Sequence, residues 1–121
     1  MSNALKSVRW VGSSYKDLVS LPKSVRKTLG FAIDQAQRGG AHMDAKPLKG
    51  FGHAGVVEVS EDNQGSTYRA VYTVRFPGVI YVLHVFQKKS KRGIATARRD
   101  IALIRQRVRE AQMDFSNREK C

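Results

Sequence analysis

Three side chains that can bind or act on a phosphate group lie within one stretch of this sequence. Arg69 is part of the apolar run TYRAVYTVRF, and His84 and Lys88 belong to the next run, VIYVLHVFQK. An arginine guanidinium can bind two phosphate oxygens at once, a lysine supplies a point charge, and a histidine transfers protons near neutral pH. These groups suit a transition state at phosphorus, in which negative charge grows on the non-bridging oxygens. The stretch therefore indicates phosphate chemistry or phosphate binding.

Each of these residues also has a purely structural interpretation. A guanidinium in an apolar strand needs a partner, and for Arg69 a phosphate is at least as good a candidate as an ion pair with Glu58. His84 can be a half-buried strand residue bonded to a neighbour, and this interpretation is slightly favoured over catalysis. Phe86 could stack on an unpaired base, but a core position is favoured. Lys88 is a better candidate for phosphate contact than for catalysis.

Further basic residues flank the two runs. Before them, the loop AHMDAKPLKGFGHA (residues 41–54) is rich in Gly, Lys and His, and after them comes a burst of lysine and arginine. The candidates for phosphate binding in these flanks are Lys46, Lys49, His53, Lys89, Lys91 and Arg92. Lys49 is also a candidate catalytic residue, because a lysine that is desolvated among like charges has a lowered pKa and can act as a base.

The sequence predicts no metal site and no cofactor. His42 and His53 lack the spacing of metal ligands, and the single cysteine, Cys121, is the last residue. A lone cysteine can form neither a disulfide within the chain nor a cysteine-based zinc site.

The charge of the chain predicts a polyanionic partner. Lys and Arg number 22 against 10 Asp and Glu, which gives a formal net charge of +12 and a pI of about 10.4. Nine basic residues lie between Lys88 and Arg109, opposed only by Asp100. Nucleic acid, a ribonucleoprotein, an anionic membrane and an acidic protein are all compatible with this excess. The density of the basic run favours a phosphate-binding surface over an ordinary solvated face.

The length of 121 residues predicts a single domain spanning 1–121, with residues 1–4 set aside as an expression remnant and 116–121 as a frayed tail. No run of 18 apolar residues and no signal-peptide core are present, so a cytoplasmic protein that does not act on membranes is expected.

The two apolar runs predict a β-hairpin that turns at Pro77-Gly78. With an even number of loop residues, Arg69 and Val71 share a face with Ile80, Val82, His84, Phe86 and Lys88, and the opposite face is a core. Pro-Gly suits a two-residue hairpin poorly, so a longer or bulged loop would shift this register.

The remaining patterns complete an α+β fold. They predict a first strand at Leu5–Val11, a short helix from Ser14 to near Leu21, a helix from Pro22 to Gly39, and a strand at Gly55–Ser60. A C-terminal helix follows, with the apolar stripe Ile94, Ala97, Ile101, Ile104, Val108 and Ala111. We expect an N-terminal strand, a helical hairpin, an antiparallel sheet of about four strands with helices packed on one face, and the C-terminal helix. The other face of the sheet would stay open and carry the basic residues.

Four motifs in this order resemble the RelE/ParE toxin superfamily. They are the element order itself, AKPLKG before the second strand, YRAVY in the third, and LHVFQKKSKRG leading into the last helix. Within the superfamily the chain is most similar to the HigB-like, phage-derived branch, in which an LH-x-F-x-KK strand end is typical. The resemblance covers roughly Ser7 to Gln112.

The resemblance implies the toxin of a type II toxin–antitoxin system. Such a protein is a metal-independent endoribonuclease that cleaves mRNA, often on the ribosome, and is inhibited by a cognate antitoxin, for which a helix-turn-helix protein is one candidate. The motifs place the family's lysines on Lys46 and Lys49, its arginine on Arg69, and its basic strand end on Lys88 and Lys89. The implied reaction is attack of a ribose 2′-OH on the adjacent phosphate, which leaves a 2′,3′-cyclic phosphate.

Two points stay open. RelE relatives often carry a tyrosine or histidine in the C-terminal segment, but Ser90–Thr96 has neither, so the general base could be His84, His53 or a lysine. A ParE-like gyrase inhibitor or a non-catalytic nucleic-acid-binding module would use the same fold.

Overall fold

The structure is a computed structural model that describes residues 5–51, 55–88 and 97–119. In chain order its elements are β1 (Ser7–Trp10), α1 (Ser14–Val19), α2 (Lys23–Gln37), β2 (Lys46–Pro47), β3 (Val56–Asn63), β4 (Ser66–Thr73), β5 (Val79–Lys88) and α3 (Arg98–Glu119). The predicted order of strands and helices is confirmed, with the two-residue strand β2 as an addition. None of the described helices is long and apolar enough to span a membrane.

The five strands form one mixed sheet in the order β1-β5-β4-β3-β2. β2, β3, β4 and β5 are antiparallel to their neighbours, whereas β1 runs parallel to β5, with Ser7 opposite Val79. The α+β class is thus confirmed, and the sheet is mixed and has five strands where an antiparallel sheet of about four strands was expected. β1 and β5 are far apart in sequence, so local turn signals carry no information about their pairing.

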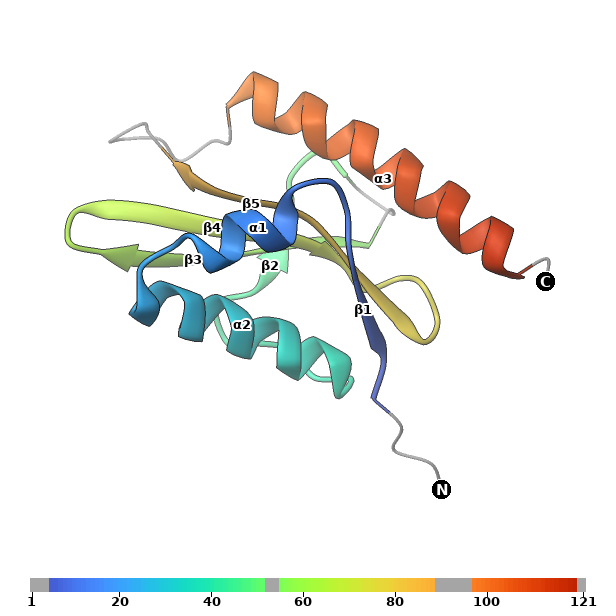
Figure 1. Cartoon of the computed structure of the whole chain (residues 1–121), viewed down its shortest axis with the longest axis horizontal. Helices are drawn as coiled ribbons and strands as arrows, with labels where there is room; N and C mark the ends of the chain where they lie inside the picture. The colour runs from blue at the N-terminus through green and yellow to red at the C-terminus, as the bar shows by residue number, and fades with distance from the viewer. Residues whose placement is uncertain (1–4, 52–54, 89–96, 120–121) are drawn as a thin grey trace.

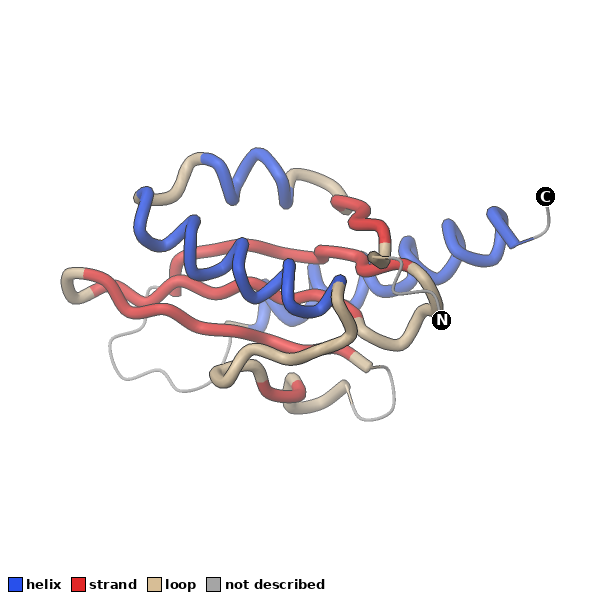
Figure 2. Tube along the Cα trace, turned by 90° about the horizontal axis from the view of Figure 1, so that it is seen from below, coloured by secondary structure: helices blue, strands red, loops and turns tan. Residues whose placement is uncertain are grey.

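Helices cover both faces of the sheet, contrary to the expectation of one open face. Figure 1 shows α3 on one side of the sheet and α2 on the other, and Figure 2 shows α1 and α2 on a common side. The α1–α2 side buries Leu29 and Ile33 against Tyr72 and Val82. On the opposite side, Ile104 and Ala111 of α3 belong to a second core, which also contains Leu48, Phe51, Val71, Tyr81 and Leu83.

A bulge in β5 determines which residues face α3. Tyr72 is paired with Val82, but the preceding residue of β4, Val71, is paired with His84, so Leu83 is an extra residue in β5. Val79, Tyr81 and Leu83 therefore pack on the α3 side, and Ile80 and Val82 on the α1–α2 side. The predicted register was right for the half of the hairpin that contains Arg69 and His84, and wrong for residues 79–83.

Candidate phosphate-binding site

The strand pairing brings four of the predicted site residues to one face of the sheet. Arg69 lies opposite Phe86, and Lys88 lies opposite Thr67, two pairs further along the same two strands. His84 lies opposite Val71, which in turn pairs with Glu58 of β3. Because side chains alternate along a strand, Arg69, His84, Phe86 and Lys88 all point to the α3 side.

Arg69 forms a buried ion pair with Glu58. Arg69 Nη1 donates to Glu58 Oε1 at 2.7 Å, and the two residues are 7% and 6% exposed. The structural interpretation of Arg69, an ion pair with Glu58, is therefore realised in the structure. This buried ion pair holds the guanidinium in place. Removal of either partner would leave the other as an uncompensated buried charge.

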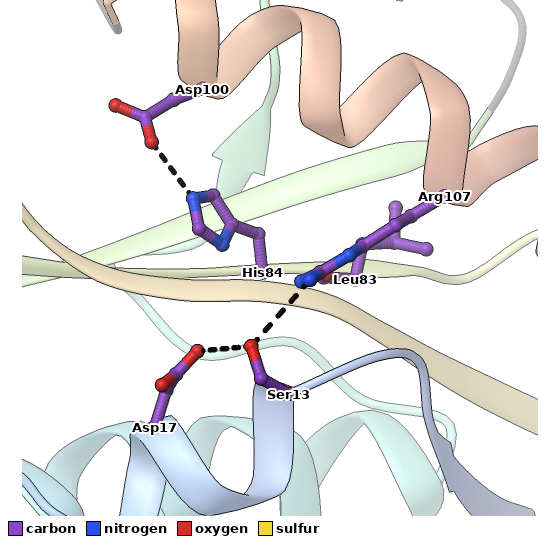
Figure 3. Close-up of polar contacts among 6 residues, drawn as sticks. All are labelled: Ser13, Asp17, Leu83, His84, Asp100 and Arg107. Carbon is purple, nitrogen blue, oxygen red and sulfur yellow. Dashed lines mark hydrogen bonds and ion pairs between the residues drawn. The ribbon is translucent and has the colours of Figure 1, made fainter.

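His84 is held from two sides. Its Nε2 lies 2.8 Å from Asp100 Oδ1 in the first turn of α3 (Figure 3). Its ring also stacks on Phe86, with 4.4 Å between ring centroids. His84 is 8% exposed, and its Nδ1 is buried without a hydrogen-bond partner in the described part of the chain. With Nε2 occupied by a carboxylate, Nδ1 is the nitrogen that can exchange a proton with a ligand.

Lys88 is a buried lysine among other charges. It is 8% exposed, and its Nζ has no hydrogen-bond partner within residues 5–51, 55–88 and 97–119. Burial lowers the pKa of the Lys88 ammonium below its usual value, and the nearby charges of Arg69 and Lys46 lower it further, while the Glu58 carboxylate raises it. A lysine in this environment releases its proton more readily than an exposed one.

The other candidates are less closely associated with this cluster. Lys46 is exposed on β2 opposite Glu58, at the edge of the same face. Lys49 is exposed in the loop between Leu48 and Gly50, and no described contact joins it to Arg69, His84 or Lys88. His53, Lys89, Lys91 and Arg92 lie outside the described residues.

The expectation of an open cationic face was wrong, since Arg69, His84 and Lys88 are buried on the side that α3 covers. The contact between Asp100 and His84 was not predicted from the sequence. Asp100 stood out only as an acidic residue within a basic run, and the packing of α3 on β5 brings the two side chains together. Within the described residues, no group of three or more His, Cys, Asp or Glu side chains could hold a metal ion.

Comparison with solved structures defines the fold class. The chain is similar to a mutant of the E. coli toxin RelE in its free state, with a TM-score of 0.51 and 18% identity over 67% of this chain and 81% of that chain. It is also similar to the toxin–antitoxin complex RelBE2 from Mycobacterium tuberculosis, with a TM-score of 0.47 and 23% identity over 67% of this chain and 95% of that chain. The similarity to the RelE mutant defines the class as an α+β, RelE-like fold.

The family follows from the sequence match. Residues 16–109 match the model of the phage-derived Gp49-like (DUF891) proteins, and the chain belongs to that family. The predicted likeness to phage-derived proteins is confirmed by this match, and the predicted RelE-like fold by the similarity to the RelE mutant. No curated protein matched the chain.

Proposed function

We propose that this protein is the toxin of a type II toxin–antitoxin system and acts as a metal-independent endoribonuclease on mRNA. The observation that carries the proposal is the convergence of Arg69, His84 and Lys88 on one face of a RelE-like sheet. The Gp49-like family and the RelE-like fold support the toxin assignment. Its place of action would be the cytoplasm, where mRNA is translated.

The proposed reaction is a transesterification at one phosphodiester. The ribose 2′-oxygen forms a bond to phosphorus as the bond from phosphorus to the 5′-oxygen breaks, which gives a 2′,3′-cyclic phosphate and a 5′-hydroxyl. His84 Nδ1 accepts the proton of the 2′-OH while Asp100 holds Nε2. Arg69 stabilises the charge on the non-bridging oxygens, and Lys88, with its lowered pKa, protonates the departing 5′-oxygen.

This mechanism requires the site to open when RNA binds. Arg69, His84 and Lys88 expose only 7–8% of their surface, too little for a phosphate to reach them. The contact between Asp100 and His84 connects the start of α3 to the site, and the open site must keep or re-form this contact for Asp100 to hold Nε2 during the reaction. Lys46, exposed at the edge of the same face, would meet the RNA first.

Lys88 offers the sharpest test of the proposal. Lys88→Met removes the charge but keeps the length of the apolar stem, and because the charge is desolvated without a described partner, the variant should be at least as stable as the wild type. Purified protein is incubated with ribosomes and a defined mRNA, and the cut positions and end groups are mapped. We expect position-specific cuts with 2′,3′-cyclic phosphate ends, reduced by about 100-fold in Lys88→Met.

The matched control is Lys27→Met, which removes an exposed lysine on α2 and should leave cleavage unchanged. Full cleavage by Lys88→Met would remove Lys88 from the mechanism. Absence of cutting by the wild type would overturn the nuclease proposal, and gyrase-dependent DNA damage would instead identify a ParE-like toxin.

We further propose that a cognate antitoxin binds this chain and blocks its activity. This chain has a net charge of +12, so an antitoxin with an acidic binding segment would be electrostatically complementary to it. Expression of the protein alone should arrest growth, and co-expression of the gene product encoded beside it should restore growth and co-purify with it. Growth arrest that no neighbouring product relieves would contradict the antitoxin proposal.

A non-catalytic nucleic-acid-binding module is the second candidate. The buried ion pair between Arg69 and Glu58 favours this candidate, because an arginine that only stabilises the fold would form the same contact. This candidate predicts salt-sensitive RNA binding without cleavage in the ribosome assay.

A further inference from the structure

Three exposed arginines form a straight line along α3. Arg98, Arg105 and Arg109 are seven and four residues apart, and at 3.6 residues per turn they lie within about 20° of one line along the helix. The spacing places them roughly 10 and 6 Å apart along the axis. The other positions on this line are Ala102, Gln112 and Ser116, so no acidic residue interrupts it. We call the three residues the arginine ridge.

Three of the four acidic residues of α3 contact or line other parts of the protein. Asp100 contacts His84, and Glu110 and Asp114 line a cavity of about 500 Å³ between α3 and β1. Glu110 is also exposed, and its carboxylate accepts a hydrogen bond from Gln106. Within the described residues, neither ion pair of α3 involves Arg98, Arg105 or Arg109, so the ridge has no paired carboxylate there.

The loop after β2 adjoins the ridge. The Arg105 guanidinium lies over the Phe51 ring, with 5.0 Å from Cζ to the ring centroid. Gly50, Phe51, Arg105 and Arg109 also line a shallow pocket of about 280 Å³. Lys49, exposed one residue before Gly50, is thus placed beside the ridge and apart from the buried cluster of Arg69, His84 and Lys88.

We propose that the arginine ridge, together with Lys49, binds the sugar–phosphate backbone of double-stranded RNA at a place distinct from the cleavage site. All the ridge cations are arginine, whose planar guanidinium can bind two phosphate oxygens at once. A membrane is a poorer fit, because the apolar stripe of α3 is already packed on the sheet and cannot insert into lipid. The inference rests on the proposed function in taking RNA as the partner.

The ridge and the buried cluster occupy different sides of α3. His84 and Lys88 lie on the sheet beneath the helix, whereas Arg98, Arg105 and Arg109 are exposed. Contacts at the ridge would therefore add affinity and orientation without taking part in bond breaking. They would also be independent of sequence, because phosphates carry no base information.

The test measures binding of the full chain to a blunt RNA duplex by fluorescence anisotropy over a series of KCl concentrations. The triple variant Arg98→Gln, Arg105→Gln, Arg109→Gln should bind about 10-fold more weakly at low salt, with a salt slope smaller by roughly 2 to 3 units. The matched control is Lys16→Gln, Lys23→Gln, Lys27→Gln, which removes the same charge from α1 and α2, on the other side of the sheet. It should keep most of the wild-type slope.

Equal losses in the two triple variants would show an effect of net charge alone and overturn the inference. Tighter binding of the wild type to vesicles of anionic lipid than to the duplex would overturn it as well. Because no cleavage is measured, the two proposals fail separately. Ridge-dependent duplex binding without mRNA cleavage contradicts only the nuclease, and cleavage without ridge-dependent binding contradicts only the ridge.

Discussion

His84 Nε2 and Asp100 Oδ1 lie 2.8 Å apart, and this contact joins the middle of β5 to the first turn of α3. The carboxylate can only accept, so the neutral imidazole must carry its hydrogen on Nε2. The two residues are thus a positioning pair, in which Asp100 fixes the ring and leaves Nδ1 as the free nitrogen.

Replacement of Asp100 should release the His84 ring. We expect Asp100→Ala to give a mixture of tautomers in ¹⁵N NMR spectra and to lower the free energy of unfolding by about 1 kcal/mol. Asp100→Asn should retain the Nε2–H tautomer, because its amide oxygen can still accept. Glu110→Ala, an exposed acidic position on the same helix, serves as the control. An unchanged tautomer in Asp100→Ala would contradict the positioning role.

The ion pair between Arg69 and Glu58 makes the single replacement of Arg69 a poor test of catalysis. Arg69→Ala leaves a buried carboxylate without its partner and should cost about 3–5 kcal/mol in urea denaturation. The double variant Glu58→Gln, Arg69→Gln should cost clearly less, because neither side chain is then charged. Equal costs for the single and double variants would show that the pair is not coupled. Activity is best compared in the double variant.

Arg107 forms a hydrogen bond from α3 to the bulge residue of β5, Leu83. Its Nη1 donates to the Leu83 carbonyl at 2.8 Å (Figure 3). Its guanidinium also lies against Gly12, whose φ is +57°. A Cβ at residue 12 would approach Arg107 Nη2 to 2.6 Å, whereas one at Gly65, with φ +83°, would meet nothing within 4 Å. Both Gly12→Ala and Gly65→Ala should lose about 1 kcal/mol from the positive φ.

Gly12→Ala should lose more, because the Arg107 side chain must also move. Arg107→Ala, which removes the hydrogen bond to the Leu83 carbonyl, should cost about 1–3 kcal/mol. Thermal melts measure all three variants. Equal losses in Gly12→Ala and Gly65→Ala would indicate that the contact with Arg107 is dispensable.

The hydrogen bond from Tyr81 to Asp114 predicts a stability change at high pH. The Tyr81 hydroxyl donates to Asp114 Oδ2 at 2.6 Å, and burial followed by this bond raises the pKa of Tyr81 from 10.0 to about 12. A pKa raised by folding gives stability that is fully present below pH 10 and is lost as the pH rises toward 12. The difference in unfolding free energy between wild type and Tyr81→Phe should therefore shrink over this interval. A constant difference would contradict the assignment.

The sequence was informative where local patterns determine structure. Alternation in the hairpin correctly placed Arg69, His84, Phe86 and Lys88 on one face. Of the predicted apolar stripe, Ile101, Ile104, Val108 and Ala111 pack on the sheet, Ala97 is exposed, and Ile94 lies outside the described residues. The sequence also contains a pattern that indicates helices on both faces of the sheet. VIYVLHVF is apolar at nearly every position, as expected for a strand buried on both sides.

Other features depend on contacts between distant segments. The parallel pairing of β1 with β5, the bulge at Leu83 and the contact between Asp100 and His84 have no local pattern that predicts them. A strand that is apolar on both sides gives no alternation from which an extra residue could be detected. The burial of Arg69 and Lys88 follows from the same packing, and so the expected open face was wrong.

The extra residue at Leu83 changes the parity of β5 halfway along its length. In a regular strand, Val79, Tyr81 and Leu83 would face one side and His84, Phe86 and Lys88 the other. With the bulge, one side of one strand both anchors α3 and carries the polar cluster. The helix is therefore aligned with the cluster through a shared backbone, and sliding α3 along β5 would displace Asp100 from His84 and Arg107 from Leu83 in the same movement.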